Sequence, residues 1–110
     1  MMPRKTRIFL ADDHAVVRKG FRLILDQEPD LEVIGEAGDG QQAVDLACAL
    51  RPDVLIIDIG MPNVNGVEAT RRILENCPES RILILSMHKD PVYVRESLRA
   101  GARGYLLKDA

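Results

Sequence analysis

The stretch PDVLIIDIGMPNVNG, residues 52–66, carries the strongest indication of the fold. Four consecutive apolar residues, 54–57, run directly into the acid Asp58, and the chain then turns toward Gly66. An unbroken apolar run of this length is typical of a strand covered on both faces, as in a parallel sheet. Burying a carboxylate at the end of a strand costs free energy unless it has a partner, so we expect other residues of the chain to interact with Asp58.

Four other segments resemble this strand. Two are equally apolar and two are weaker, and together with 54–57 they give five predicted strands at residues 8–11, 31–37, 54–57, 82–85 and 104–107. Between the strands, apolar residues recur at helical spacing. Strand and helix therefore alternate with short connections, which predicts an α/β fold: a doubly wound, five-stranded parallel sheet with helices on both faces.

Capping residues mark where three of the helices begin. Asp39 and Asn65 each stand three residues before a Gln or Glu, and Asp90 precedes a proline. These are the residues that satisfy free amides at helix starts. Spacing also predicts that Ile24 belongs to the apolar face of the first helix and Leu98 to that of the last.

Length and composition bound the function. The 110 residues suffice for one domain, residues 1–110, and the net charge of −2 gives no electrostatic footprint for direct nucleic-acid binding by this chain. No apolar run is long enough to span a membrane, and residues 8–11 are too few for a secretory signal. We therefore expect a cytoplasmic protein that does not enter the membrane.

Three acids follow predicted strands. Asp12 and Asp13 follow the first strand and Asp58 ends the third, so the carboxyl ends of neighbouring strands bring them to one edge of the sheet. Two like charges about 4 Å apart repel by roughly 4 kcal/mol at an effective dielectric of 20. A divalent cation relieves this repulsion, and Mg²⁺ suits carboxylate ligands better than Ca²⁺ because no calcium-loop motif is present.

A hydroxyl and an ammonium are expected at the same edge. The fourth strand ends at Ser86 and the fifth near Lys108. Each residue alone has a plain explanation as a cap, a turn residue or a solvated lysine, but their coincidence at successive strand ends favours a site. A carboxylate that attacks a phosphoryl group would need such groups to neutralise its oxygens. We interpret His14 and His88, nearby, as partly exposed loop histidines.

These residues resemble the receiver domain of bacterial two-component response regulators. The matching positions are Asp12 and Asp13 after the first strand, Asp58 in IIDIGMPNVNG, Ser86 in LILSMH and Lys108 in GARGYLLKDA. The similarity runs from about residue 7 to residue 109. The motifs DDH, LSMH and GARGYLLKDA further resemble the subfamily whose receivers precede a LuxR-type helix-turn-helix output domain.

The resemblance implies a flavodoxin-like strand order, 2-1-3-4-5, and a phosphorylation-controlled switch. Asp58 would accept a phosphoryl group from a sensor histidine kinase or a small donor such as acetyl phosphate. Mg²⁺ would be held by Asp13, Asp58 and the main-chain carbonyl of Gly60, with Asp12 acting through water. Lys108 would pair with the phosphoryl oxygens.

Further roles follow from the same resemblance. Ser86 and Tyr105 would be the switch residues, whose movement alters the surface formed by the fourth helix, about residues 91–100, and the fifth strand. A homodimer could form through that surface. Gly60 and His88 occupy positions that modulate hydrolysis of the phosphoryl group. The family's closing helix is missing after residue 107, so we expect a C-terminally truncated domain without its output domain.

Two other classes of protein remain as alternatives. Phosphatases or phosphotransferases of the haloacid-dehalogenase type also form an aspartyl phosphate, but they need a second acid two residues after the nucleophile, where this sequence has Gly60. A flavodoxin-like cofactor carrier would need a phosphate-binding loop after the first strand, where this chain has acids. We therefore expect self-directed phosphoryl transfer and autodephosphorylation, without turnover of other substrates.

Overall fold

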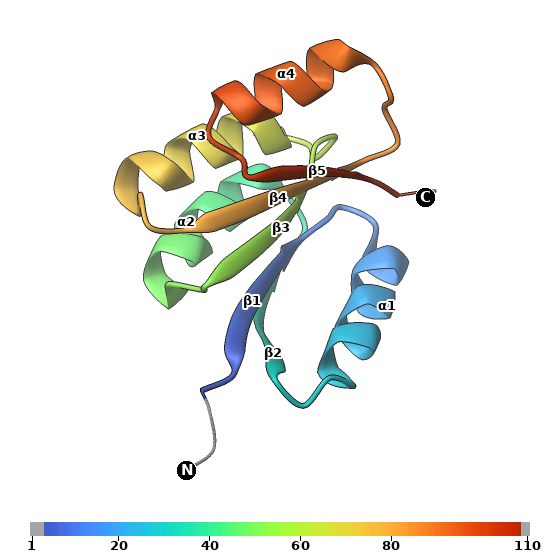
Figure 1. Cartoon of the computed structure of the whole chain (residues 1–110), viewed down its shortest axis with the longest axis vertical. Helices are drawn as coiled ribbons and strands as arrows, with labels where there is room; N and C mark the ends of the chain where they lie inside the picture. Colours follow the sequence, from blue (N-terminus) through green and yellow to red (C-terminus); the bar gives the residue numbers. More distant parts are fainter. Residues whose placement is uncertain (1–3, 109–110) are drawn as a thin grey trace.

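Five strands form one parallel sheet in the computed structural model, which describes residues 4–108 (Figure 1). Along the chain they are β1 (Thr6–Ala11), β2 (Leu31–Ala37), β3 (Val54–Asp58), β4 (Arg81–Ser86) and β5 (Gly104–Leu107). Across the sheet the order is β2-β1-β3-β4-β5, with every neighbouring pair parallel. The predicted fold class and strand order are confirmed.

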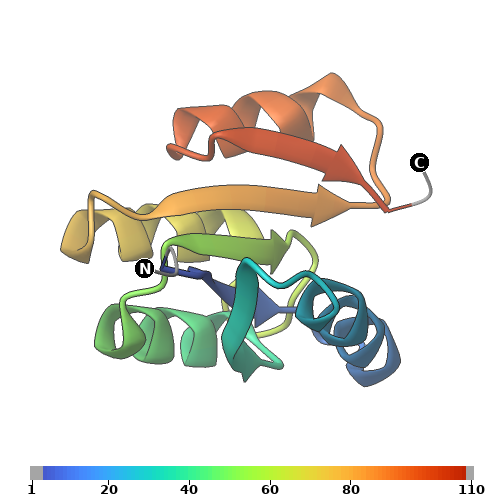
Figure 2. The same ribbon diagram turned by 60° about the horizontal axis from the view of Figure 1, so that its bottom comes forward.

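Four helices connect the strands within the described residues. They are α1 (Ala15–Asp26), α2 (Gly40–Leu50), α3 (Gly66–Asn76) and α4 (Pro91–Arg99). Helix α1 covers one face of the sheet at β1 and β2, and the other three helices cover the opposite face (Figure 2). Up to residue 108 no helix follows β5, as predicted; Asp109 and Ala110, on which that prediction also rested, lie outside the described residues.

Both faces of the central strands are buried, which explains their unbroken apolar sequences. On the α2 and α3 side, alternate strand residues such as Phe9, Leu55 and Ile84 are fully buried in the larger core cluster. The residues between them, such as Ile8 and Leu10, form a second cluster under α1. Because each face needs its own apolar residues, the strands cannot alternate between polar and apolar positions.

The helices begin where the capping residues predict. Asp39 accepts a hydrogen bond from the Gln42 amide at 2.8 Å, and Asn65 accepts one from the Glu68 amide at 2.9 Å. Asp90 caps α4 in the same way, with Pro91 as its first residue. Local chemistry therefore sets these helix starts.

Several residues on the predicted apolar faces of the helices are exposed. Ile24 of α1 is 63% exposed and Leu98 of α4 is 50% exposed. In α4 the fully buried residue is the neighbouring Ser97, whose hydroxyl donates to the Tyr93 carbonyl at 2.7 Å. A helix that covers the sheet with a narrow stripe buries only the centre of its apolar face, and helical period alone does not locate that centre.

Candidate functional site

The carboxyl edge of the sheet brings together residues that are distant in sequence. Ala11 of β1 is in register with Ile57 of β3, so Asp12 and Asp58, each the next residue, leave the sheet side by side. Both residues are almost fully buried, with 4% and 5% of their surface exposed. Two carboxylates are therefore fixed next to each other in a poorly solvated place, as the sequence predicted.

The turn after Asp58 is held by a close backbone approach at Gly66. The Gly66 amide donates to the Ile59 carbonyl at 2.9 Å, and a Cβ at Gly66 would lie 2.5 Å from the Asp58 carbonyl oxygen. No other residue fits there without moving the backbone. This contact places the start of α3 directly beside Asp58.

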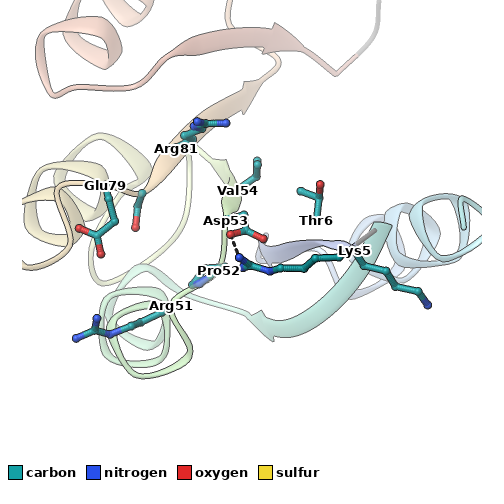
Figure 3. Close-up of a pocket in the computed structure, with 10 residues that line it drawn as sticks. Lys5, Thr6, Arg51, Pro52, Asp53, Val54, Glu79 and Arg81 are labelled. Atoms are coloured by element: carbon teal, nitrogen blue, oxygen red, sulfur yellow. Dashed lines mark hydrogen bonds and ion pairs between the residues drawn. The ribbon is translucent and has the colours of Figure 1, made fainter. Parts of the chain in front are cut away.

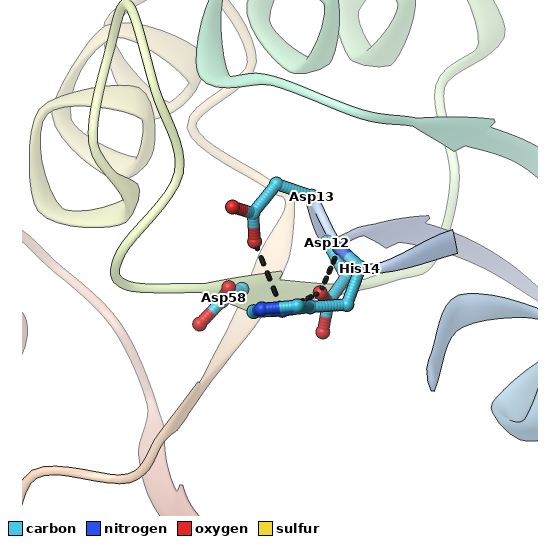
Figure 4. Close-up of side chains that lie close together, drawn as sticks. All are labelled: Asp12, Asp13, His14 and Asp58. Carbon is cyan, nitrogen blue, oxygen red and sulfur yellow. Dashed lines mark hydrogen bonds and ion pairs between the residues drawn. The ribbon is translucent and has the colours of Figure 1, made fainter. Parts of the chain in front are cut away.

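A cluster of potential metal ligands surrounds this point. One ligand atom from each of Asp12, Asp13, His14 and Asp58 lies within 4.8 Å of the others (Figure 4). The buried Oδ2 of Asp12 has no hydrogen-bond donor among the described residues. Hard oxygen ligands with an unsatisfied buried carboxylate suit a cation such as Mg²⁺, and the residues present therefore fit a divalent metal.

Lys108 reaches this cluster from the end of β5. Its Nζ lies 3.0 Å from Asp12 Oδ2 and 3.2 Å from Asp58 Oδ1. The contact with Asp12 is an ion pair, which gives the Asp12 carboxylate a positive partner. The Lys108 amide donates to the Ser86 carbonyl at 2.9 Å, which fixes the backbone beneath the ammonium.

The electrostatics of the cluster reflect too few positive charges for its acids. Burial raises the pKa of Asp58 above its ordinary value, and the nearby charge of Asp12 raises it further, despite the opposing effect of Lys108. Burial lowers the pKa of Lys108, but its contacts with Asp12 and Asp58 outweigh burial and leave that pKa raised. The ammonium therefore stays charged, while ionised Asp58 is disfavoured until another cation arrives.

Ser86 and Tyr105 are connected to each other through His88. The fully buried Ser86 hydroxyl accepts a hydrogen bond from the His88 amide at 2.9 Å, and the Tyr105 hydroxyl donates to the His88 carbonyl at 2.8 Å. The His88 ring stacks on Tyr93 of α4, with ring centroids 4.5 Å apart. These residues thus join the loop after β4 to both β5 and α4.

Gly60 lies between the acids and this loop. Its amide donates to Asp58 Oδ1 at 3.4 Å, and a Cβ at Gly60 would have no heavy atom within 4 Å. A hollow of about 250 Å³ beside it is also lined by Ile59, His88 and Tyr93. A side chain at position 60 would therefore project into open space two residues after Asp58.

Two contacts at the site were missed from the sequence. His14 Nδ1 lies 3.1 Å from Asp13 Oδ1 and 3.2 Å from Asp12 Oδ1, although we interpreted it as a loop histidine. Its side chain is largely exposed, which agrees with that interpretation. Arg18 of α1 donates to the Asp12 carbonyl at 2.6 Å. Nothing in the local spacing distinguishes Arg18 from the other basic residues of α1.

Comparison with known proteins agrees with this arrangement. Residues 8–110 match the family model described as the response regulator receiver domain. This chain belongs to that family. The receiver domain is 47% identical over 105 residues to the transcriptional regulatory protein DegU of Brevibacillus brevis, a match that covers 96% of this chain and 44% of DegU.

Two solved structures resemble the receiver domain closely. The signal receiver domain of NarL from Mycobacterium tuberculosis superposes with a TM-score of 0.94 at 36% identity, covering 98% of this chain and 87% of that one. A LuxR-family response regulator from Aurantimonas sp. SI85-9A1 gives 0.92 at 37% identity, covering 96% and 76%. The predicted resemblance to receivers of the LuxR type is confirmed.

The receiver domain spans about half the length of the curated relatives that it matches. Receiver domains of LuxR-type regulators are signalling switches of two-component systems rather than classical enzymes. Across residues 4–108, none of the helices is both long and apolar enough to cross a membrane.

Proposed function

We propose that this receiver domain is a phosphorylation-controlled switch whose phosphoacceptor is Asp58. The observation that carries the proposal is the buried Asp58 carboxylate, set beside Asp12 and held 3.2 Å from the Lys108 ammonium. A structural carboxylate would have a cation of its own, whereas this one shares Lys108 with a second buried acid. Such an arrangement is stabilised when a cation binds beside the two acids.

The proposed reaction is a single in-line transfer. An Asp58 carboxylate oxygen attacks phosphorus, the bond from phosphorus to the donor's nitrogen or oxygen breaks, and the electron pair leaves with the donor. Lys108 would move from its contact with Asp58 to the phosphoryl oxygens and offset their charge. Gly60 leaves the approach open, and His88 borders it, so both positions would modulate later hydrolysis by water.

Asp13, Asp58 and the Gly60 carbonyl would hold Mg²⁺, with Asp12 as an outer partner. When bound, Mg²⁺ would neutralise charge on the phosphoryl oxygens and on the acids. The chain itself supplies the positions: Asp12 and Asp58 are buried at adjacent strand ends, and Asp13 is more exposed and faces the same point.

The signal would leave the site through Ser86 and Tyr105. The Ser86 hydroxyl accepts from the His88 amide, and its Oγ would have to move toward the phosphoryl group to donate to one of its oxygens. That movement would weaken the contact that holds His88, whose carbonyl anchors the Tyr105 hydroxyl. The loop after β4, α4 and β5 would then adopt a second arrangement.

The proposed partners follow from the family. Receiver domains are phosphorylated by histidine kinases, so we propose a sensor histidine kinase as the donor. Residues 1–110 would act as the receiver part of a cytoplasmic regulator with a DNA-binding output domain. A second copy could bind the face formed by α4 and β5, which exposes large apolar side chains: Met87, Val92, Tyr93, Leu98 and Leu106.

The intact mass of the chain after incubation with acetyl phosphate and Mg²⁺ tests the proposal. We expect the mass of one added phosphoryl group, and we expect none in Asp58→Asn or in the presence of EDTA. Circular dichroism on the same samples shows that each is folded. A folded wild-type chain that gains no mass, or an Asp58→Asn variant that gains the same mass, would contradict the proposal.

A further inference from the structure

Arg18 connects the acidic site to β2, the edge strand next to β1. Its Nη1 donates to the main-chain carbonyl of Asp12 at 2.6 Å, and its Nε pairs with Glu36 Oε1 at 3.1 Å. The Arg18 and Glu36 side chains are both mostly buried. One guanidinium therefore joins α1, the loop after β1 and the end of β2.

The carbonyl that Arg18 contacts lies at the centre of the site. It belongs to the peptide group that joins Asp12 to Asp13, so its orientation determines the direction in which both carboxylates leave the backbone. The same loop is fixed from within, because Asp12 Oδ1 accepts a hydrogen bond from the His14 amide at 2.8 Å. Arg18 supplies the contact that holds this peptide from outside the loop.

Glu36 gives Arg18 a fixed direction. Leu10 of β1 is in register with Glu36 of β2, which places the acid one residue before the carboxyl edge and close to Asp12. Arg22, one helical turn after Arg18, binds the other Glu36 oxygen and also pairs with Asp26. Glu36 is thus fully occupied, and the planar fork of Arg18 has little freedom to leave the Asp12 carbonyl.

We propose that Arg18 and Glu36 form a clamp that positions Asp12 and Asp13 for binding Mg²⁺. This inference rests on the proposed function, because it names residues that serve the same metal site. Arg18 is a positioning residue: it acts through the Asp12–Asp13 peptide and contacts neither the metal nor the phosphoryl group. Outer partners of metal ligands commonly change metal affinity by about 10–100-fold.

The direction in which Mg²⁺ affinity changes when Arg18 is replaced distinguishes a positioning role from a purely electrostatic one. A guanidinium near the acids repels an incoming cation, so removing it would tighten Mg²⁺ binding if charge were its only role. Removing a positioning contact has the opposite effect, because the acids must then be ordered when the metal binds. Arg18→Gln removes the charge and the fork together, and its Mg²⁺ affinity therefore decides between the two roles.

Titration of the ¹⁵N-labelled chain with MgCl₂, followed by the Gly60 amide signal, measures this affinity. We expect Mg²⁺ binding about tenfold weaker in Arg18→Gln, at the lower end of the range for outer partners. Arg18→Lys, which keeps the charge but cannot bridge both groups, should weaken binding by a similar factor. Lys19→Gln is the matched control: it removes a positive charge from an exposed position of the same helix, next to Arg18, and should bind within about twofold of wild type.

A second measurement needs no metal. Amide hydrogen exchange at Asp13 and His14 should be faster in Arg18→Gln than in wild type, and unchanged in Lys19→Gln, in EDTA. Equal or tighter Mg²⁺ binding by Arg18→Gln, in a chain whose wild type binds Mg²⁺, overturns the clamp alone. A folded wild-type chain that binds no Mg²⁺ overturns both the clamp and the metal-dependent function.

Discussion

At the amino edge of the sheet, Asp53 binds Arg4 through Oδ1 at 2.8 Å and accepts a hydrogen bond from the Arg7 amide through Oδ2 at 2.8 Å (Figure 3). At the carboxyl edge, Asp12 and Asp58 share Lys108, and among residues 4–108 one buried oxygen of Asp12 receives no hydrogen bond. Both edges therefore combine aspartates with basic residues. The difference is that both oxygens of Asp53 have partners, whereas the carboxyl edge leaves negative charge unsatisfied.

The larger cavity lies at the amino edge, away from the acidic cluster. The amino edge has a cavity of about 450 Å³, lined among others by Arg4, Lys5 and Asp53, whereas the hollow beside Gly60 is about 250 Å³. Arg7 also satisfies the last carbonyls of α2, at Leu50 and Arg51. Unsatisfied buried charge, rather than cavity size, is therefore what marks the edge proposed to accept the phosphoryl group.

The sharpest test exchanges one acid at each edge. Asp58→Asn should abolish phosphoryl acceptance, because the nucleophilic carboxylate is lost. Asp53→Asn should accept a phosphoryl group at the wild-type rate and lose about 1–2 kcal/mol of unfolding free energy, since its charged acceptor is removed. Intact mass and urea unfolding measure the two effects. Loss of acceptance in a folded Asp53→Asn chain would erase the distinction between the edges.

Lys108 should matter more to the chemistry than to the metal. In Lys108→Ala we expect phosphoryl acceptance to slow by an order of magnitude or more, because a preorganised cation is lost. Mg²⁺ binding should be retained. NMR shifts of α4 amides should no longer change upon phosphorylation. A Lys108→Ala chain that accepts the phosphoryl group normally and shows the wild-type change in α4 would contradict this role.

Removing the charge of Asp58 should stabilise the folded chain. Its pKa is raised in the folded chain by burial and by Asp12, so the ionised carboxylate costs folding free energy above that pKa. In EDTA at neutral pH, Asp58→Asn should therefore raise the unfolding free energy by roughly 0.5–2 kcal/mol. The gain should shrink as the pH falls, because the folded wild type then protonates Asp58. Urea unfolding at several pH values measures it; a gain that grows toward low pH would reverse the sign.

The smallest effect is expected from Arg4 at the amino edge. Its side chain is 70% exposed, so Arg4→Ala should change the unfolding free energy by about 1 kcal/mol or less. Mg²⁺ binding and phosphoryl acceptance should be unchanged. A large loss of either in Arg4→Ala would show that the amino edge takes part in the switch.

Much of the site could be predicted because its acids stand at strand ends. Asp12 and Asp58 directly follow apolar runs, and parallel neighbours bring such positions together. The spacing of residues along a helix was less informative. Ile24 and Leu98 have the expected period but are exposed, because the width of the buried stripe depends on how each helix lies on the sheet.

The sequence by itself determined the strands, the helix starts and the residues at the carboxyl edge, since apolar runs, caps and strand ends are local features. Only the tertiary structure decided that Arg18 meets both Asp12 and Glu36, and that Tyr105 meets the His88 carbonyl. Those contacts depend on strand register and on the seating of α1 and α4. The spacing of residues along the chain does not predict the register of the strands or the placement of the helices, because both depend on packing between distant segments.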